Sequence, residues 1–307
     1  MCLQSNEKGE KTMRYILTTD NLTKKYGDKV AAGNINIHIP EGEIYGLIGR
    51  NGAGKTTIMR MLSGLSSPTE GSFKYNGNSD NGIGVLIESP GIFPNRSAFD
   101  NIKIKCIAMG CYKKEYVNEL LDIVGLSYTG KKPAGSFSLG MRQRLGIALA
   151  LTGNPKFIVL DEPINGLDPQ GIAEVRETLE KLRDEKKITI MISSHILDEL
   201  GKLADSYGII NNGELIDEFT NEELEQRCGR YVTVHTSDNA KAVEMIKSMG
   251  ISDVDIKGDT IRINECLDQT AEINKMLVNS GLEVNEIHKT NISLEDYYLS
   301  LTGGKRK

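Results

Sequence analysis

The sequence predicts an α/β domain with a largely parallel sheet, followed by a smaller α+β domain of the split β-α-β type. Three observations lead to this fold class. Short apolar runs alternate with helix-like segments as far as about Thr220, several of these runs are apolar at every position, and the order of elements then changes. The length of 307 residues is sufficient for one full core and a second, smaller one.

The strands of the first domain follow from two kinds of apolar pattern. Ile35, Ile37 and Ile39 alternate with polar residues, which predicts a strand with one buried face, and a turn at Pro40–Gly42 separates it from the strand Ile44–Ile48. Later runs are continuously apolar, as in strands buried on both faces of a parallel sheet. These runs are Ile83–Ile87, Phe157–Leu160 and Ile188–Ile192. Between Ala98 and Gly125 the pattern is helical, which indicates a helical subdomain at about residues 90–150.

The second domain has the element order β-α-β-β-α-β. The expected elements are the strand Tyr231–Thr236, the helix Asn239–Met249, a hairpin of Val254–Ile256 and Ile261–Ile263, the helix Asp268–Val278 and the strand Leu282–Ile287. A last helix, Ser293–Leu301, has Ser293 as its N-cap. We therefore expect a disordered leader over residues 1–12 with Met13 as the natural start, a first domain over 13–220, an accessory domain over 221–307 and a frayed basic tail.

Composition and charge narrow the class of function. The 39% hydrophobic and 26% charged residues are typical of soluble globular proteins, and no apolar run reaches the length of about 18 residues that crosses a bilayer. The net charge of −5 argues against nucleic acid as a partner, because binding to phosphates needs an excess of Lys and Arg. The five cysteines are scattered, without a CxxC pair, and are typical of reduced thiols in a cytoplasmic protein.

A glycine-rich loop after the strand Ile44–Ile48 predicts a phosphate-binding site. The segment Gly49–Thr57 fits the pattern G-x-x-x-x-G-K-[ST] in the context that this pattern requires. Backbone N–H groups of such a loop surround phosphate oxygens, the ammonium of Lys55 reaches the β- and γ-phosphates, and the hydroxyl of Thr56 is available to Mg²⁺. The predicted ATP-binding residues of the loop are Gly49, Asn51, Gly52, Ala53, Gly54, Lys55, Thr56 and Thr57.

Two acids at the end of a second buried strand complete the predicted nucleotide site. Asp161 and Glu162 follow the run Phe157–Leu160, and in a parallel sheet the carboxyl ends of the strands lie at the ligand-binding edge. Asp161 is expected to bind Mg²⁺ through its water shell. Glu162 is expected to polarise the water that attacks the γ-phosphate.

Four further segments give the chain a resemblance to the ATP-binding cassette (ABC) proteins. Ser138–Arg144 resembles the signature motif of this family, Asn165–Pro169 its D-loop and Ser193–His195 its switch histidine, and Tyr26 falls where the family stacks an aromatic ring on adenine. The match follows the family's order from about Tyr15 to Phe219. The resemblance implies a P-loop cassette with a parallel core sheet, an antiparallel β edge and a helical subdomain.

The resemblance also implies a mechanism that needs two subunits. ATP and Mg²⁺ would lie between Lys55 of one subunit and the Ser138 hydroxyl and Gly140 N–H of a second, which is the same chain or a related one. His195 would contact the γ-phosphate as a catalytic residue with Glu162 and Lys55, and Asp168 would align the subunits. Hydrolysis would open the dimer and drive transmembrane permease subunits, which would hold the chain at the inner face of the cell membrane.

One variant position points to a subfamily. Glu88 stands where most relatives have the glutamine of the Q-loop, and its carboxylate is a candidate Mg²⁺ ligand beside Thr56 and Asp161. Together with the signature Phe137–Arg144 and the segment Ser293–Tyr298, this glutamate gives the chain a resemblance to the ATP-binding subunits of bacterial exporters that give resistance to bacitracin and lantibiotic-type peptides. Leu139 and Met141 replace the usual glycine and glutamine of the signature, although Ser138 and Gly140 are kept.

Three alternatives remain beside the peptide exporter. The chain could be the ATPase of another bacterial exporter, for drugs or polysaccharide, because none of these residues reads the transported substrate. A soluble ABC protein of DNA repair or translation would have a long coiled coil or two cassettes, and this chain has one cassette without a heptad run. A catalytically inactive binding module would not need both Glu162 and His195.

Overall fold

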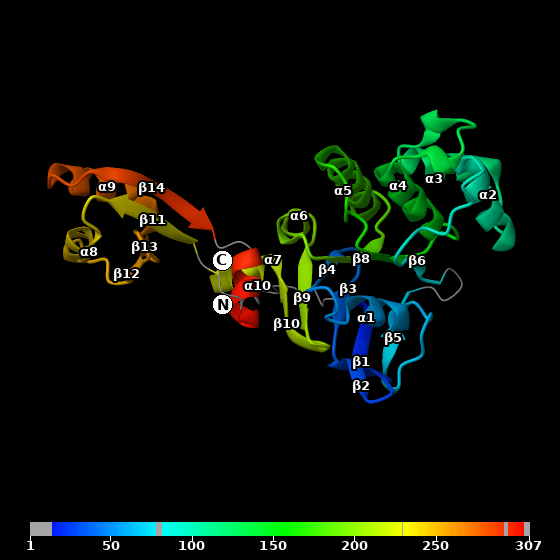
Figure 1. The fold of residues 1–307 in the computed structure, drawn as a ribbon, viewed down its shortest axis with the longest axis horizontal. Helices are drawn as coiled ribbons and strands as arrows, with labels where there is room; N and C mark the ends of the chain where they lie inside the picture. The colour runs from blue at the N-terminus through cyan, green and yellow to red at the C-terminus, as the bar shows by residue number, and fades with distance from the viewer. Residues whose placement is uncertain (1–13, 78–81, 229, 292–293, 304–307) are drawn as a thin grey trace, which may run out of the picture. The chain divides into compact units, whose positions relative to one another are not determined.

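The computed structural model describes residues 14–77, 82–228, 230–291 and 294–303. The chain divides into two compact units, of which the first ends at Phe219 and the second begins at Thr220 (Figure 1). The expected leader over residues 1–12, the start at Met13, the N-cap Ser293 and most of the basic tail lie outside the described residues.

A six-stranded sheet forms the centre of the first unit. Its strand order is β10-β9-β4-β8-β7-β6, and β4 pairs in parallel with both β8 and β9, as β7 does with β6 and β8. The strands are β4 (Ile44–Ile48), β6 (Gly84–Leu86), β7 (Phe157–Asp161), β8 (Thr189–Ser194), β9 (Ser206–Asn211) and β10 (Glu214–Thr220). The prediction of a parallel sheet built from the continuously apolar runs is therefore confirmed.

An antiparallel sheet forms around β1. The strands are β1 (Tyr15–Tyr26), β2 (Lys29–Ile35), β3 (His38–Pro40) and β5 (Glu70–Tyr75), and β1 pairs with each of the other three. The single strand expected through Ile35, Ile37 and Ile39 is interrupted, although all three isoleucines are fully buried. The hydroxyl of Thr19 occupies the break, donating to the Ile35 carbonyl at 2.7 Å and accepting the Ile37 N–H at 2.7 Å.

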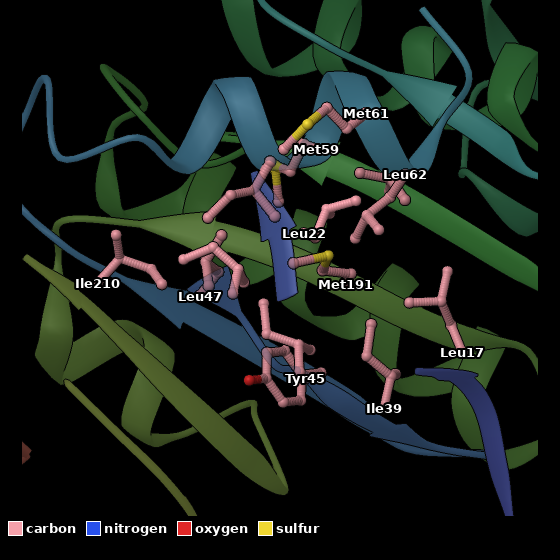
Figure 2. Close-up of a cluster of buried hydrophobic side chains, with 14 of the residues drawn as sticks. Leu17, Leu22, Ile39, Tyr45, Leu47, Met59, Met61, Leu62, Met191 and Ile210 are labelled. Carbon is pink, nitrogen blue, oxygen red and sulfur yellow. The ribbon is translucent and has the colours of Figure 1, made fainter. Parts of the chain in front are cut away.

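Helix α1 (Lys55–Leu62) packs with both sheets in one hydrophobic core (Figure 2). Met59 and Leu62 of the helix join a buried cluster that includes Leu22 of β1 and Tyr45 and Leu47 of β4. Because β4 and α1 are held by this core on either side of the glycine-rich loop, the loop is fixed at both ends.

The predicted helical subdomain is present. It contains α2 (Ala98–Ala108), α3 (Lys114–Ile123) and α4 (Leu139–Ala150), which pack against one another, with short 3-10 turns at Ser127–Thr129 and Ala134–Ser136. The hydroxyl of Ser97 accepts the N–H of Asp100 and so caps α2. Two further helices, α5 (Pro169–Asp184) and α6 (Leu197–Gly201), complete the first unit.

The second unit has the predicted order and an antiparallel sheet β12-β13-β11-β14. Ile246 of α8 and Leu277 of α9 join Val232 of β11 and Ile261 of β13 in a separate hydrophobic core. The elements are α7 (Asn221–Cys228), β11 (Arg230–Thr236), α8 (Asn239–Ser248), β12 (Val254–Lys257), β13 (Thr260–Ile263), a 3-10 turn (Leu267–Gln269), α9 (Thr270–Asn279), β14 (Val284–Asn291) and α10 (Leu294–Thr302). In the part of the chain that the structure describes, none of the helices is both long and apolar enough to cross a membrane.

Candidate functional site

The glycine-rich loop turns into α1 through a glycine that no other residue could replace without strain. Gly54 precedes the first helical residue, Lys55, with a φ of 111°. A Cβ added at Gly54 would lie 2.6 Å from the carbonyl oxygen of Ala31 on β2. The loop therefore directs the free N–H groups at the start of α1 into the space beside it, where they can bind an anion.

The ammonium of Lys55 is held inside the loop. Its Nζ donates to the carbonyl oxygen of Gly49 at 2.6 Å and lies 3.3 Å from Oε1 of Glu162. The Lys55 side chain is only 6% exposed and that of Glu162 is 20% exposed. An ion pair that is this well shielded from water is stronger than a surface pair, because solvent screens it less.

Asp161 is fixed by hydroxyl groups from two other elements. Thr56 of α1 donates to its Oδ2 at 2.8 Å, and Ser193 of β8 donates to its Oδ1 at 2.6 Å. The Ser193 oxygen also accepts the backbone N–H of Glu162 at 2.9 Å. In the sequence, Ser193 belongs to a predicted motif only because it stands two residues before His195. The contact of Ser193 with the acidic pair follows from the parallel pairing of β7 with β8.

Glu162 and His195 meet across the ends of β7 and β8. Nδ1 of His195 lies 2.6 Å from Oε2 of Glu162, so the carboxylate contacts the imidazole with one oxygen and Lys55 with the other. Glu162 follows the last residue of β7 and has a φ of 50°, in the left-handed region that non-glycine residues seldom adopt. The three residues predicted to be catalytic are thus together.

A cleft of about 700 Å³ opens beside this cluster. It is lined by the predicted residues Tyr26, Asn51, Gly52, Gly54, Lys55, Thr56, Thr57 and Glu162. Two more lining residues, Arg50 and Asn165, lie in the predicted glycine-rich loop and D-loop, whereas the sequence did not indicate Lys29, Val30, Ala31, Asn212 and Gly213. Gly213 lies in the turn between β9 and β10, and its N–H donates to the carbonyl of Ala53 at 2.9 Å. The dipeptide Asn212-Gly213 is typical of a hairpin turn, but no local motif places this turn beside the glycine-rich loop, which it reaches only through the fold.

Tyr26 lies at the rim of the cleft with half of its surface exposed, and the ammonium of Lys24 is 5.2 Å from its ring centroid. An exposed aromatic ring at the mouth of a phosphate site offers a flat surface on which a base can stack.

Ser138 and Gly140 of the predicted signature lie close to Asp168 of the predicted D-loop, and none of the three lines this cleft. Ser138 caps α4, with its Oγ accepting the Met141 N–H at 3.2 Å, and Asp168 caps α5, with its Oδ1 accepting the Gly171 N–H at 2.9 Å. A Cβ at Gly140 would lie 3.7 Å from the Cα of Gly171, so the two helix starts adjoin. Neither Ser138 nor Gly140 lines the cleft of its own chain, and their expected contact with ATP bound to a second subunit remains a prediction.

Glu88 is not brought into the acidic cluster. Its carboxylate pairs with the guanidinium of Arg60 on α1, and its side chain is 62% exposed. Glu88 has a φ of 65° and does not line the cleft beside Lys55. Its expected role as a Mg²⁺ ligand remains a prediction.

Comparison with known proteins relates the whole chain to transporter subunits. The sequence profile described as ABC transporter matches residues 32–165. The bacitracin transport ATP-binding protein BcrA of Bacillus licheniformis is 43% identical over 95% of this chain and 99% of its own length. The lantibiotic transport ATP-binding protein SrtF of Streptococcus pyogenes is 47% identical over 66% of this chain and 89% of its own.

Solved structures give the same relation for about two thirds of the chain. The protein cbiO1 of Clostridium perfringens, described as part of the ABC transporter complex cbiONQ, superposes with a TM-score of 0.62 at 26% identity, covering 69% of this chain and 91% of that one. The cassette MJ0796, described as a dimer in a post-hydrolysis state bound to ADP and Pi, gives a TM-score of 0.58 at 25% identity over 66% of this chain and 98% of that one. Because it is 43% identical over 95% of its length to a transport ATP-binding protein, this chain belongs to the ABC transporter family, as one of its ATP-binding ATPase subunits.

Proposed function

We propose that this chain is the ATP-hydrolysing subunit of a bacterial exporter that removes a peptide antibiotic of the bacitracin or lantibiotic type and so confers resistance or immunity. The relatives named for bacitracin transport support this proposal because the similarity extends over 95% of the chain, beyond the cassette and into the second unit. The names of these relatives describe their own transport, and the substrate class is carried over from them.

The observation that carries the ATPase role is the placement of Glu162 between Lys55 and His195. When the phosphates of ATP draw the ammonium of Lys55 toward them, the carboxylate of Glu162 is freed to accept a proton from water at the γ-phosphate. His195 then keeps that carboxylate oriented through the 2.6 Å contact.

The oxygen donors beside the loop fit Mg²⁺. The Thr56 hydroxyl and the Asp161 carboxylate are hard ligands only 2.8 Å apart, and Mg²⁺ commonly binds through one or two such groups together with phosphate oxygens. Among the described residues, no three His, Cys, Asp or Glu side chains gather to hold a metal by themselves, so the phosphates of the nucleotide would complete the ligand set. When bound, Mg²⁺ would neutralise charge on the β- and γ-phosphates.

An apolar groove of about 470 Å³ supports docking on a permease. It lies between β6 and the helical subdomain, with Leu86, Phe93, Ile104 and Leu149 among its lining residues. Phe93 is 54% exposed and Ile104 is 38% exposed, so apolar surface of the groove is accessible to a partner. A short helix from a membrane subunit would fit this groove, and through that subunit the chain would be held at the cytoplasmic face of the membrane.

The substitution Glu162→Gln tests the catalytic part of the proposal. ATP hydrolysis should slow by roughly 10²- to 10⁴-fold, the usual contribution of a general base, while an ATP-bound dimer persists. Steady-state phosphate release and gel filtration with ATP measure the two effects. The matched control is Glu185→Gln, at an exposed acid beyond α5, which should leave the rate unchanged. Near-normal hydrolysis by Glu162→Gln would assign the base elsewhere.

The transported substrate is tested in sensitive bacteria that produce the chain with its permease subunits. Resistance to bacitracin or to a lantibiotic should be present with the parent chain and with Glu185→Gln, and absent with Glu162→Gln. If the complex hydrolyses ATP in vesicles and responds to small drugs but to neither peptide class, the alternative of a drug exporter is correct and the peptide assignment fails.

A further inference from the structure

Two cysteines meet at the carboxyl end of α2. The N–H of Cys111 donates to the carbonyl of Cys106 at 2.9 Å, and the N–H of Gly110 donates to the carbonyl of Ile107 at 3.0 Å. Gly110 has a φ of 70°. These two bonds and the left-handed glycine define a Schellman motif, in which the residue after the glycine packs against the residue five positions before it.

In this chain both contact positions of the motif are cysteine. Cys106 is fully buried and Cys111 is half-buried, and both are free thiols. Burial is the main cause that raises the pKa of the Cys106 thiol to about 11, and its interactions with Cys111, which include a hydrogen bond, add to this effect. The backbone hydrogen bond holds the two residues close together, which is the first requirement for a disulfide without backbone movement.

We propose that Cys106 and Cys111 form a reversible redox modification site, which closes to an intramolecular disulfide at the end of α2 on reaction with a small-molecule disulfide. The half-buried Cys111 reacts first. Its sulfur attacks the oxidant, one Cys111 S–S bond forms, the oxidant's own S–S bond breaks and one small thiol leaves. The Cys106 sulfur then attacks the Cys111 sulfur and releases the second small thiol. Two electrons and the two thiol protons pass from the pair to the oxidant.

The groups around the pair set the pH dependence of its closure. Lys105 of α2 lowers the pKa of Cys106, but less than burial raises it, and Tyr116 of α3 interacts electrostatically with both thiols. Lys105 itself donates to the carbonyl of Leu149 on α4 at 2.7 Å. Cys106 is therefore protonated near neutral pH. Because the thiolate is the attacking form, the rate of the second step should rise about tenfold for each unit by which the pH is raised, as long as the pH stays below the Cys106 pKa.

The full chain with Cys2→Ser, Cys228→Ser and Cys266→Ser isolates the pair for the test. After treatment with glutathione disulfide and blocking of free thiols, trypsin releases one fragment that begins at Cys106 and contains both cysteines. We expect this fragment to be two hydrogen masses lighter than its reduced form and unblocked, and to return to the doubly blocked form after reduction. A fragment that stays doubly blocked, or that carries glutathione on Cys111 without closing, would overturn the proposal.

Single variants separate the two steps. Cys106→Ser should accumulate glutathione on Cys111, whereas Cys111→Ser should leave the buried Cys106 unmodified; equal reaction of both variants would contradict the assigned order. If Cys106→Ser fails to fold, Cys106→Ala serves as the second variant. Unfolding the parent in urea should lower the closed fraction at least about tenfold, because the Schellman motif then no longer raises the effective concentration of the thiols. An unchanged fraction of disulfide would show that the short separation of the two cysteines in the sequence, and not the fold, is sufficient for disulfide formation, and would contradict the proposal.

Discussion

Ser193 is the residue on which the acidic pair depends. Its hydroxyl donates to Asp161 and accepts the N–H of Glu162, so it holds the metal-side carboxylate and the backbone of the proposed base at once. Ser193 is fully buried, and removing its oxygen would take away one hydrogen bond from the Asp161 carboxylate and the one that the Glu162 N–H makes with it.

We expect Ser193→Ala to lower kcat for ATP hydrolysis by about tenfold or more and to raise the Mg²⁺ concentration needed for half-maximal rate, because a hydrogen bond to a charged group contributes about 1.5–3 kcal/mol. A Mg²⁺ titration of the steady-state rate measures both effects. Ser194→Ala is the matched control, since the neighbouring hydroxyl contacts the Ile196 backbone rather than the acids. Equal losses in the two variants would argue against this role.

Local motifs identify the residues of the site that act through their type and spacing. The segment Gly49–Thr57, the acids Asp161 and Glu162, and His195 could be predicted from the sequence, and the structure brings all of them to one edge of the sheet. The contacts of Ser193 and of the turn at Gly213 depend on which strands are neighbours in the sheet. No single segment of the sequence determines this strand order.

At the scale of elements, the loop before β12 is tied to the end of β13 by one carboxylate. Glu265 accepts the N–H of Asp253 at 2.8 Å, the hydroxyl of Ser252 at 3.0 Å and the N–H of Ser252. These hydrogen bonds favour the ionised form and lower the pKa of Glu265 below its ordinary value of 4.5.

We therefore expect Glu265→Gln to lower the melting temperature of the second unit at neutral pH and to have no such effect in acid. A lowered pKa contributes stability above the unfolded value, and this contribution is lost as the pH falls through the folded value. Thermal unfolding of parent and variant at pH 7 and at about pH 3 measures the difference. A variant that is equally destabilised at both pH values would show that packing, not ionisation, is responsible.

Helix α2 carries a matched pair for the proposed permease groove. Ile104 lines the groove, whereas Ile107, one turn further on, is exposed without lining it. We expect Ile104→Glu to weaken copurification with the permease subunits at least about tenfold, because a carboxylate would be buried in an apolar contact, and Ile107→Glu to have little effect. The ATPase rate of the free subunit should be unchanged in both; a loss in Ile104→Glu would indicate a folding defect instead.

Strands differ in how far the sequence predicts them. The continuously apolar β7 is visible because both of its faces are buried, and every one of its residues is buried in the structure. β1 is the longest strand, yet its polar residues conceal it: Thr19 and Thr23 are buried, and the hydroxyl of each takes part in hydrogen bonds with backbone groups. A hydropathy pattern indicates buried apolar side chains. It cannot reveal a buried threonine whose hydroxyl is hydrogen-bonded to backbone groups inside the protein.

At the scale of the whole molecule, the two units have separate hydrophobic cores. We expect two unfolding transitions in calorimetry, of which ATP with Mg²⁺ raises only the one that belongs to the cassette. At a ligand concentration of 100 times Kd the stabilisation is about 2.7 kcal/mol, which raises the midpoint by about 5–10 °C. Lys55→Ala should abolish this shift. A single transition that moves as a whole with ATP would mean that the units unfold together.

The placement of Lys55 between the Gly49 carbonyl and Glu162 has a consequence for how nucleotide affinity responds to ionic strength. The central cation already has a counter-ion before the nucleotide arrives, so binding exchanges one anionic partner for another instead of neutralising a bare charge. Added salt competes equally for the cation before and after that exchange. The affinity for ATP should therefore vary only weakly with salt concentration, and small anions such as sulfate should be poor competitors.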